Sequence, residues 1–245
     1  MIGLFQRARL LSLFTVSQDC VLCDAPDVDV VCQPCRLSLP SASRTSHACP
    51  VCAAPNHAQV CGACLRDAPD FDATIAAFNY HFPLDRLVKS FKFSANLTLV
   101  DFFADALAAE ISRQAQPPPT QIVALPLANK RLASRGFNQS ALLADALGIR
   151  LKLNVAHHAM RRIRETPPQT GLSKALRLKN IKGAFECDAN FTAQHIVIVD
   201  DVMTTGATLS EAAKVVKQAG ASRVTTWIIA RAVANTVANT GEQHD

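Results

Sequence analysis

Apolar residues recur along most of the chain in two alternating patterns. Runs rich in apolar residues at 71–80, 121–126, 196–199 and 223–230 predict strands. Between them, apolar residues three and four positions apart predict helices, most clearly from Leu99 to Ile111. Strands that alternate with helices predict an α/β domain with a mainly parallel sheet.

Cap and turn residues suggest where these elements begin and end. Helices are expected over 83–93, 96–114, 138–148 and 207–220. Asn138 is the predicted N-cap of the third helix, and Gly148 and Gly220 are the predicted stops of the last two. The polar, basic stretch 161–180 contains Pro167 and Pro168 and is expected to form a long excursion.

Length and composition indicate the number of domains and the cellular compartment. The chain has 245 residues, of which 49% are hydrophobic, so one or two globular domains are expected. No apolar run approaches the length of about 18–20 residues that a membrane helix needs. Arg7 and Arg9 interrupt the apolar N-terminus, unlike a secretory signal, so we expect a cytoplasmic protein without a membrane span; a degenerate targeting segment is the alternative.

Positive charge is concentrated in one segment. Residues 121–182 contain twelve basic and two acidic residues, whereas the whole chain has a formal net charge of only +5. Such a segment attracts polyanions, either nucleic acid or a small ligand with several phosphates. A solvated basic face is the plain alternative.

The cysteines mark a separate N-terminal module. Eight of the nine lie in residues 20–64, as four C-x-x-C pairs whose spacing is the same in each half, which indicates an internal duplication. We therefore predict a module over residues 1–68, an α/β domain over 69–235 and a flexible tail over 236–245.

Four C-x-x-C pairs predict two tetrahedral Zn²⁺ sites with four thiolates each. Disulfides, redox pairs and iron–sulfur clusters are the alternatives, and the regular halves favour zinc ribbons. His47 and His57 are not expected to be ligands. Pairing in chain order is the simplest arrangement, although spacing also permits crossed pairing; in order, the ligands are Cys20, Cys23, Cys32 and Cys35 for one site and Cys49, Cys52, Cys61 and Cys64 for the other.

The stretch 196–209 carries the clearest chemistry. Asp200 and Asp201 follow the apolar run, where ligands bind in open α/β sheets, and successive side chains of a strand point to opposite sides. The next residues suit a phosphate, since they offer hydroxyls, a glycine and a helix N-terminus. A ribose with a 5-phosphate would satisfy both parts. An acidic helix cap and a Mg²⁺-binding acidic pocket are the alternatives. The predicted phosphate loop consists of Thr204, Thr205, Gly206, Ala207 and Thr208.

At these residues the chain resembles the type I phosphoribosyltransferases. The resemblance implies their fold and binding of 5-phosphoribosyl 1-pyrophosphate with Mg²⁺. Asp200 and Asp201 would hold the ribose hydroxyls, and the loop 204–208 would hold the 5-phosphate. It also implies a pyrophosphate loop after an earlier strand, which 127–131 would provide. Lys130, Arg131 and Arg135 are the candidates for offsetting charge on the leaving pyrophosphate, and 161–182 is the candidate lid.

Further residues are similar to the ComF family, which combines a phosphoribosyltransferase-like domain with a double zinc ribbon. These are the stretch "RGFNQS", the Cys-rich N-terminus and the candidate lid contacts Arg164, Gln169, Arg177 and Asn180. The resemblance implies a role in bacterial DNA uptake and use, with single-stranded DNA or DNA-uptake proteins as partners. An accessory nucleic-acid-binding protein and a sugar-phosphate sensor are the alternatives to an enzyme, and no residue identifies the acceptor.

Overall fold

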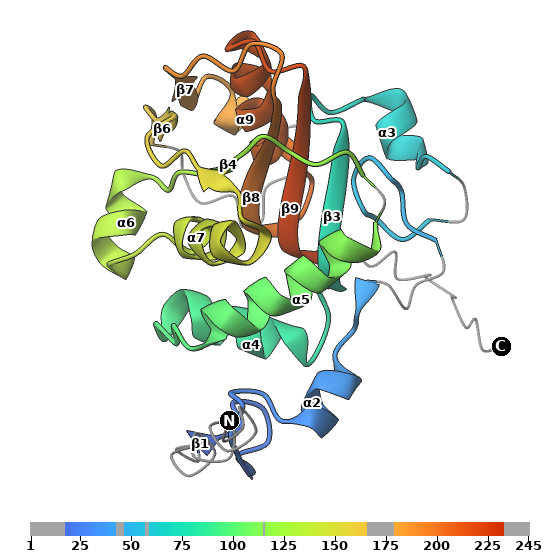
Figure 1. Cartoon of the computed structure of the whole chain (residues 1–245), viewed down its shortest axis with the longest axis vertical. Helices are drawn as coiled ribbons and strands as arrows, with labels where there is room; N and C mark the ends of the chain where they lie inside the picture. The colour runs from blue at the N-terminus through green and yellow to red at the C-terminus, as the bar shows by residue number, and fades with distance from the viewer. Residues whose placement is uncertain (1–17, 43–46, 57–58, 115, 166–178, 233–245) are drawn as a thin grey trace, which may run out of the picture.

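The computed structural model describes residues 18–42, 47–56, 59–114, 116–165 and 179–232. Its centre is a five-stranded sheet in the order β3-β9-β8-β4-β5, in which all neighbouring strands run parallel (Figure 1). The predicted α/β domain with a parallel sheet is therefore confirmed. The strands are β3 (Ala73–Asn79), β4 (Gln121–Ala124), β5 (Asn154–Val155), β8 (His195–Met203) and β9 (Arg223–Arg231).

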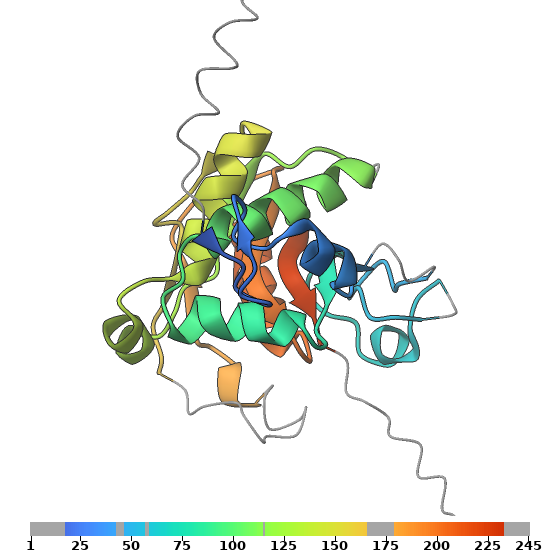
Figure 2. The same ribbon diagram turned by 90° about the horizontal axis from the view of Figure 1, so that it is seen from below.

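Helices cover both faces of this sheet, as Figures 1 and 2 show. Along β8, Val197 and Val199 pack with α4, α5 and α7, whereas Ile196 and Ile198 pack with α9. A strand buried on both faces has no polar alternation, which explains the unbroken apolar run. No helix in the described ranges is long and apolar enough to cross a membrane. The covering helices are α4 (Leu84–Phe93), α5 (Leu99–Arg113), α7 (Gln139–Leu151) and α9 (Ala207–Gln218).

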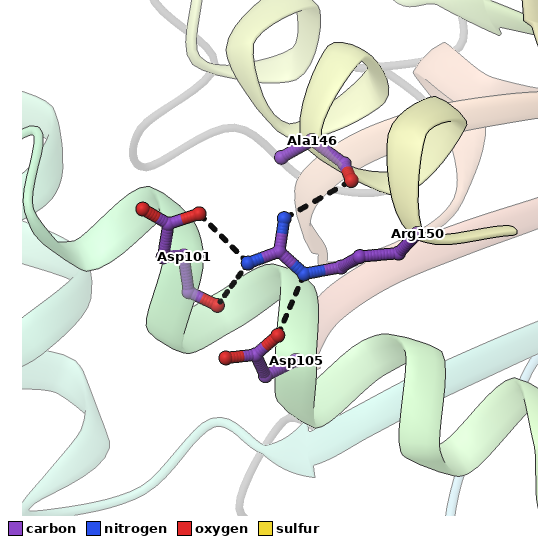
Figure 3. A network of polar contacts seen from close by, with 4 residues as sticks. All are labelled: Asp101, Asp105, Ala146 and Arg150. Atoms are coloured by element: carbon purple, nitrogen blue, oxygen red, sulfur yellow. Dashed lines mark hydrogen bonds and ion pairs between the residues drawn. The ribbon is translucent and has the colours of Figure 1, made fainter. Parts of the chain in front are cut away.

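A polar staple joins α5 to α7 at the surface (Figure 3). Arg150 on α7 donates hydrogen bonds to the carboxylates of Asp101, at 2.7 Å, and Asp105, at 2.6 Å. It also donates to the carbonyl of Ala146 at 3.1 Å. The two carboxylates are mostly exposed, so apolar packing between α5 and α7 contributes more to stability than this network does.

The predicted start of α7 is confirmed, and its predicted C-terminal end is wrong. The Asn138 side chain caps the helix by accepting a hydrogen bond from the amide of Ser140 at 3.0 Å. Gly148 does not end it, because α7 continues to Leu151 and Lys152 adopts the left-handed conformation at the C-cap. A Cβ on Gly148 would lie 2.7 Å from Val155 and 2.9 Å from the carbonyl of Leu153. This glycine permits close approach of the following chain.

Two other segments differ from expectation. The stretch 127–131, expected as a loop, runs into the short helix α6 (Asn129–Arg135), which ends at Gly136 with φ 82°. The excursion 161–180 begins at β6 (Met160–Arg162), which pairs antiparallel with β7 (Phe185–Cys187). These two strands form the stem of the excursion.

The two halves of the Cys-rich segment lie on either side of β3, the outermost strand. The first half contains β1 (Gln18–Asp19), β2 (Pro26–Asp27) and α2 (Gln33–Ser38), and it packs with the α5 side of the core. The second half contains α3 (Gly62–Arg66) and packs with the α9 side. Figure 1 shows α2 and α3 well separated. Two parts of this segment touch β3: Ser41, between the halves, bridges Phe78, and the carbonyl of Pro50, in the second half, accepts a hydrogen bond from the Thr74 amide at 3.2 Å.

Candidate functional site

The site forms because β8 is longer than its neighbour β4. The register pairs Ala124, the last residue of β4, with Val199, and Leu125 still donates to the Val199 carbonyl at 3.0 Å. Beyond that point β8 pairs only with β9, where Asp200 lies opposite Ile228. The carboxylates therefore lie within β8, whereas the sequence predicts them just after the strand. A cavity of about 410 Å³ opens beside them.

Lining residues of this cavity come from β8, α4, α6, β6 and two loops. The loop 125–127 follows β4, and the loop 204–208 leads from β8 into α9. We call this space the carboxylate cavity. Its walls are Lys92, Leu125, Pro126, Leu127, Arg131, Arg135, Arg162 and the run 200–209.

The two carboxylates have different partners, as the alternation of side chains along a strand predicts. Asp201 forms an ion pair with Lys92 of α4, with 2.9 Å between Nζ and Oδ1. Asp200 accepts a hydrogen bond from the Ser140 hydroxyl at the start of α7, at 3.0 Å. Burial and then the charge of Asp201 raise the pKa of Asp200 to about 7, although Lys92 and Ser140 act in the opposite direction.

All five residues of the predicted phosphate loop 204–208 line the cavity, and the last two form the start of α9. Gly206 has φ 79° and is the N-cap of α9, so the positive end of the helix faces the cavity wall. A Cβ on Gly206 would be 3.5 Å from the Phe71 ring, an ordinary contact. This position therefore favours glycine because of its positive φ, and not because a side chain would lack space.

Three arginines also line the cavity. Arg131 and Arg135 come from α6, and Arg162 comes from β6. Burial lowers the pKa of Arg135 and of Arg162, and the charge of Arg131 adds to the effect on Arg162. Within the described ranges, neither Arg131 nor Arg135 has a hydrogen bond or ion pair from its guanidinium. Arg131 and Arg135 therefore bring to the cavity positive charge that no carboxylate among the described residues neutralises by direct contact.

Several predicted residues lie elsewhere or cannot be placed. Lys130 does not line the cavity, since its side chain is 86% exposed and pairs with Glu165 at 2.9 Å. Arg164 donates to the carbonyls of Asn180, at 2.8 Å, and Lys182, so it ties the two ends of the excursion together. Gln169 and Arg177, with most of the candidate lid, lie outside the described residues.

Sequence reasoning missed three residues of the site. Lys92 and Arg162 touch or line it but belong to no motif of their own, and Ser140 ends the stretch "RGFNQS" without having been assigned to the site. Lys92 sits between two phenylalanines at the end of an amphipathic helix, a position typical of an ordinary solvated lysine. Only the way the helices pack at the C-terminal ends of the strands brings these side chains to the carboxylates.

The cysteines form two clusters, each with all four sulfur atoms within 4.8 Å of one another. They pair in chain order. The two clusters repeat one another closely: Cys23–Cys32 and Cys52–Cys61 are both 3.6 Å apart between sulfurs. The donor set of four thiolates fits zinc, so both clusters can hold it. The ligand sets are Cys20, Cys23, Cys32 and Cys35, and Cys49, Cys52, Cys61 and Cys64, and no histidine in the described ranges joins them.

Similarity to known proteins agrees with this arrangement. A phosphoribosyl transferase domain matches residues 132–240. A "DNA utilization protein YhgH" of Salmonella typhi is 35% identical over 171 residues, which cover 68% of this chain and 75% of the relative. "Competence protein F" of Haemophilus influenzae is 31% identical over 176 residues, 69% of this chain and 76% of the relative.

The chain belongs to the ComF family.

The predicted family membership and fold class are thus confirmed, and the cysteine clusters fit the zinc ribbons that precede the phosphoribosyltransferase domain in this family. A further ComF relative, "Competence protein ComFC" of Streptococcus pneumoniae, is 29% identical over 156 residues, 64% of this chain and 67% of the relative. Among solved structures, adenine phosphoribosyltransferase from Leishmania tarentolae is similar at 14% identity and a TM-score of 0.40, over 67% of this chain and 92% of that one.

Proposed function

We propose that this ComF protein binds 5-phosphoribosyl 1-pyrophosphate with Mg²⁺ in the carboxylate cavity and holds it for transfer of the phosphoribosyl group. One observation carries the proposal. A pair of carboxylates that have different partners opens onto the same cavity as the predicted phosphate loop 204–208. Vicinal hydroxyls next to a phosphate need this juxtaposition: acceptors for the ribose from Asp200 and Asp201, and donors for the 5-phosphate from 204–208.

The donor set fits Mg²⁺ that arrives with its substrate. In the described ranges, the clusters of three or more metal-binding side chains are both made of cysteine, so the cavity offers two carboxylates and no complete acidic cage. Mg²⁺ commonly uses one or two carboxylates, together with water and substrate phosphates. When bound, the ion would supply positive charge to the pyrophosphate oxygens. Lys92 already offsets part of the carboxylate charge, through its ion pair with Asp201.

The arginines suit the leaving group. When the bond between C1 of the ribose and the pyrophosphate oxygen breaks, the electron pair leaves with pyrophosphate, whose charge therefore grows. Arg131, Arg135 and Arg162 line that space, and one guanidinium group can donate hydrogen bonds to two phosphate oxygens at once. Because Lys130 points away and pairs with Glu165, we assign it a smaller part than Arg131 and Arg135.

Calorimetric titration of the zinc-loaded protein with phosphoribosyl pyrophosphate and Mg²⁺ tests the binding site. The double variant Asp200→Asn/Asp201→Asn is expected to lose affinity by at least about a hundredfold, since two charge-assisted hydrogen bonds disappear. The matched control is Asp101→Asn/Asp105→Asn, which removes the same charge from exposed carboxylates on α5. Equal affinity of wild type and the site variant would sink the assignment.

A second measurement asks whether the sugar phosphate is consumed. Pyrophosphate release in the presence of a panel of nitrogenous bases and amines is expected for a transferase. Binding without release across that panel favours the sensor.

The names of the relatives place this family in DNA utilisation and competence, and we propose the same setting for this chain. The basic segment 121–182 favours contact with single-stranded DNA as a second activity. Binding of an oligonucleotide should then weaken steeply with salt, and the slope should fall in Lys130→Gln/Arg131→Gln/Arg135→Gln. A salt-independent affinity speaks against this second activity and leaves the sugar-phosphate site untouched.

A further inference from the structure

A buried arginine connects the second cysteine cluster to the predicted phosphate loop. Arg231 is the last residue of β9 and only 8% exposed. Its Nε donates to the carbonyl of Cys52 at 2.7 Å. Its Nη1 donates to the carbonyl of Met203, the last residue of β8, at 3.1 Å, and to the carbonyl of Thr204, which begins the loop. One side chain thus holds a cluster cysteine, the last residue of β8 and the first residue of the loop.

The chemistry of guanidinium explains why these segments are held together. A buried charge is costly unless hydrogen bonds satisfy it. The planar guanidinium presents several N–H groups at fixed angles, so it fixes the relative positions of the carbonyls that it joins. In the described ranges all hydrogen-bond acceptors of Arg231 are carbonyls, the fourth being that of Ala232. Displacement of Cys52 would leave part of this charge unsatisfied and would disturb Met203 and Thr204.

A second set of contacts supports the same coupling. Asp70 and Phe71 lie just after the second cluster in the chain. The Ser210 hydroxyl, in the first turns of α9, donates to the Asp70 carboxylate at 2.8 Å and accepts from the Asp70 amide at 3.0 Å. The Phe71 ring, which is 2% exposed, packs beside Gly206. Contacts from the side of the second cluster therefore reach the start of the loop, Gly206 within it and the first turns of α9 that follow it.

In the described ranges, the Arg231 guanidinium makes no such contact with the first cluster. Its apolar neighbours Val31 and Leu39 are buried with α5, and the Arg36 guanidinium lies over the Phe102 ring, 5.4 Å from its centre. The two clusters have nearly the same sulfur geometry: the Cys32 amide lies 3.4 Å from the Cys20 sulfur, and the Cys61 amide lies 3.4 Å from the Cys49 sulfur. The first cluster is a natural control for the second.

We infer that Arg231 is a positioning residue through which zinc in the second cluster, and not in the first, sets the conformation of the loop 204–208. One expectation from this inference rests on the proposed function: that sugar-phosphate affinity depends on one of the two metal sites. The other expectation concerns the loop itself and does not depend on the proposed function. Its amides should be more open to exchange with solvent when the second cluster loses its metal.

The experiment compares Cys61→Ser with Cys32→Ser, which alter equivalent ligands of the two clusters. Metal analysis should give one zinc fewer per chain in each variant. Amide hydrogen exchange without ligand is then measured across 203–209. In Cys61→Ser, exchange is expected to rise about tenfold, which corresponds to the loss of about one stabilising hydrogen bond. In Cys32→Ser, it is expected to stay within about twofold of wild type. Phosphoribosyl pyrophosphate affinity should follow the same order.

The variants Arg231→Lys and Arg231→Met keep all eight cysteines of the two clusters. They test the inference even if a cysteine variant fails to fold. Lysine retains the charge without the planar fork, so loop exchange should rise in the order wild type, lysine, methionine, while zinc content stays at two per chain. Equal loop protection in Cys61→Ser and Cys32→Ser, or in Arg231→Met and wild type, overturns the inference. If the wild type binds no phosphoribosyl pyrophosphate, the proposed function fails, and the exchange data still decide this inference.

Discussion

Replacing Asp200 with asparagine should stabilise the protein at alkaline pH while it impairs the site. Burial and the neighbouring Asp201 raise the pKa of Asp200 from 3.8 to about 7 in the folded chain. Because this acid holds its proton more tightly when folded, the group destabilises the fold progressively as pH rises above 3.8, and the penalty is complete above about 7. At 1.36 kcal/mol per pKa unit, the full penalty is at most about 4 kcal/mol.

Of that penalty, about 2.5 kcal/mol accrues between pH 5 and pH 8. The assay is urea unfolding of wild type and Asp200→Asn with zinc bound, at both pH values. The stability of the variant relative to wild type should increase by up to this amount from pH 5 to pH 8, and comparison at each pH cancels the titration of the cysteines. Asp201→Asn is the contrasting variant, since it leaves the partly buried Lys92 without its partner and should destabilise. A relative stability of Asp200→Asn that does not change with pH would refute the reasoning.

Three further predictions follow from the site and the packing. Arg135→Gln should weaken phosphoribosyl pyrophosphate binding by about tenfold or more in calorimetry, whereas Lys130→Gln should change it by less than about threefold, because only the former lines the cavity. Gly206→Ala should cost about 1–2 kcal/mol in urea unfolding, since an alanine must adopt φ near 79°, and a cost near zero would show that the loop relaxes. Arg150→Met should cost about 0.5–1 kcal/mol at low salt and less in 1 M NaCl, and a cost that salt leaves unchanged would mean that packing rather than charge is lost.

Local patterns predicted most of the elements that position the site. The apolar run before Asp200 and the cap at Asn138 are signals carried by a few neighbouring residues, and both were read correctly. Gly148 misled because a glycine marks close approach as well as a helix end, and only the structure shows Val155 and Leu153 against it. The cysteine pairing needed the fold as well, since spacing alone permits other arrangements.

The contributors that the sequence did not reveal act across long distances in the chain. Lys92 reaches Asp201 from more than a hundred residues away, and Arg231 reaches Cys52 across 179. Neither belongs to a motif, and both are ordinary residues at the ends of regular elements. Their roles follow from the register of β8 and β9 and from the helices packed at the ends of the strands.

The position of the Cys-rich segment on either side of β3 has one more consequence. A strand at the border of a sheet offers unpaired amides and carbonyls to other chains and is a hazard for aggregation. Here parts of the Cys-rich segment occupy that border: the carbonyl of Pro40, between the two clusters, accepts from the Asn79 amide at 2.8 Å, and Thr74 donates hydrogen bonds to the carbonyls of Pro50 and Val51, within the second cluster. Loss of zinc from both clusters would therefore uncover the outer side of β3, so metal-depleted protein should self-associate before its central sheet unfolds.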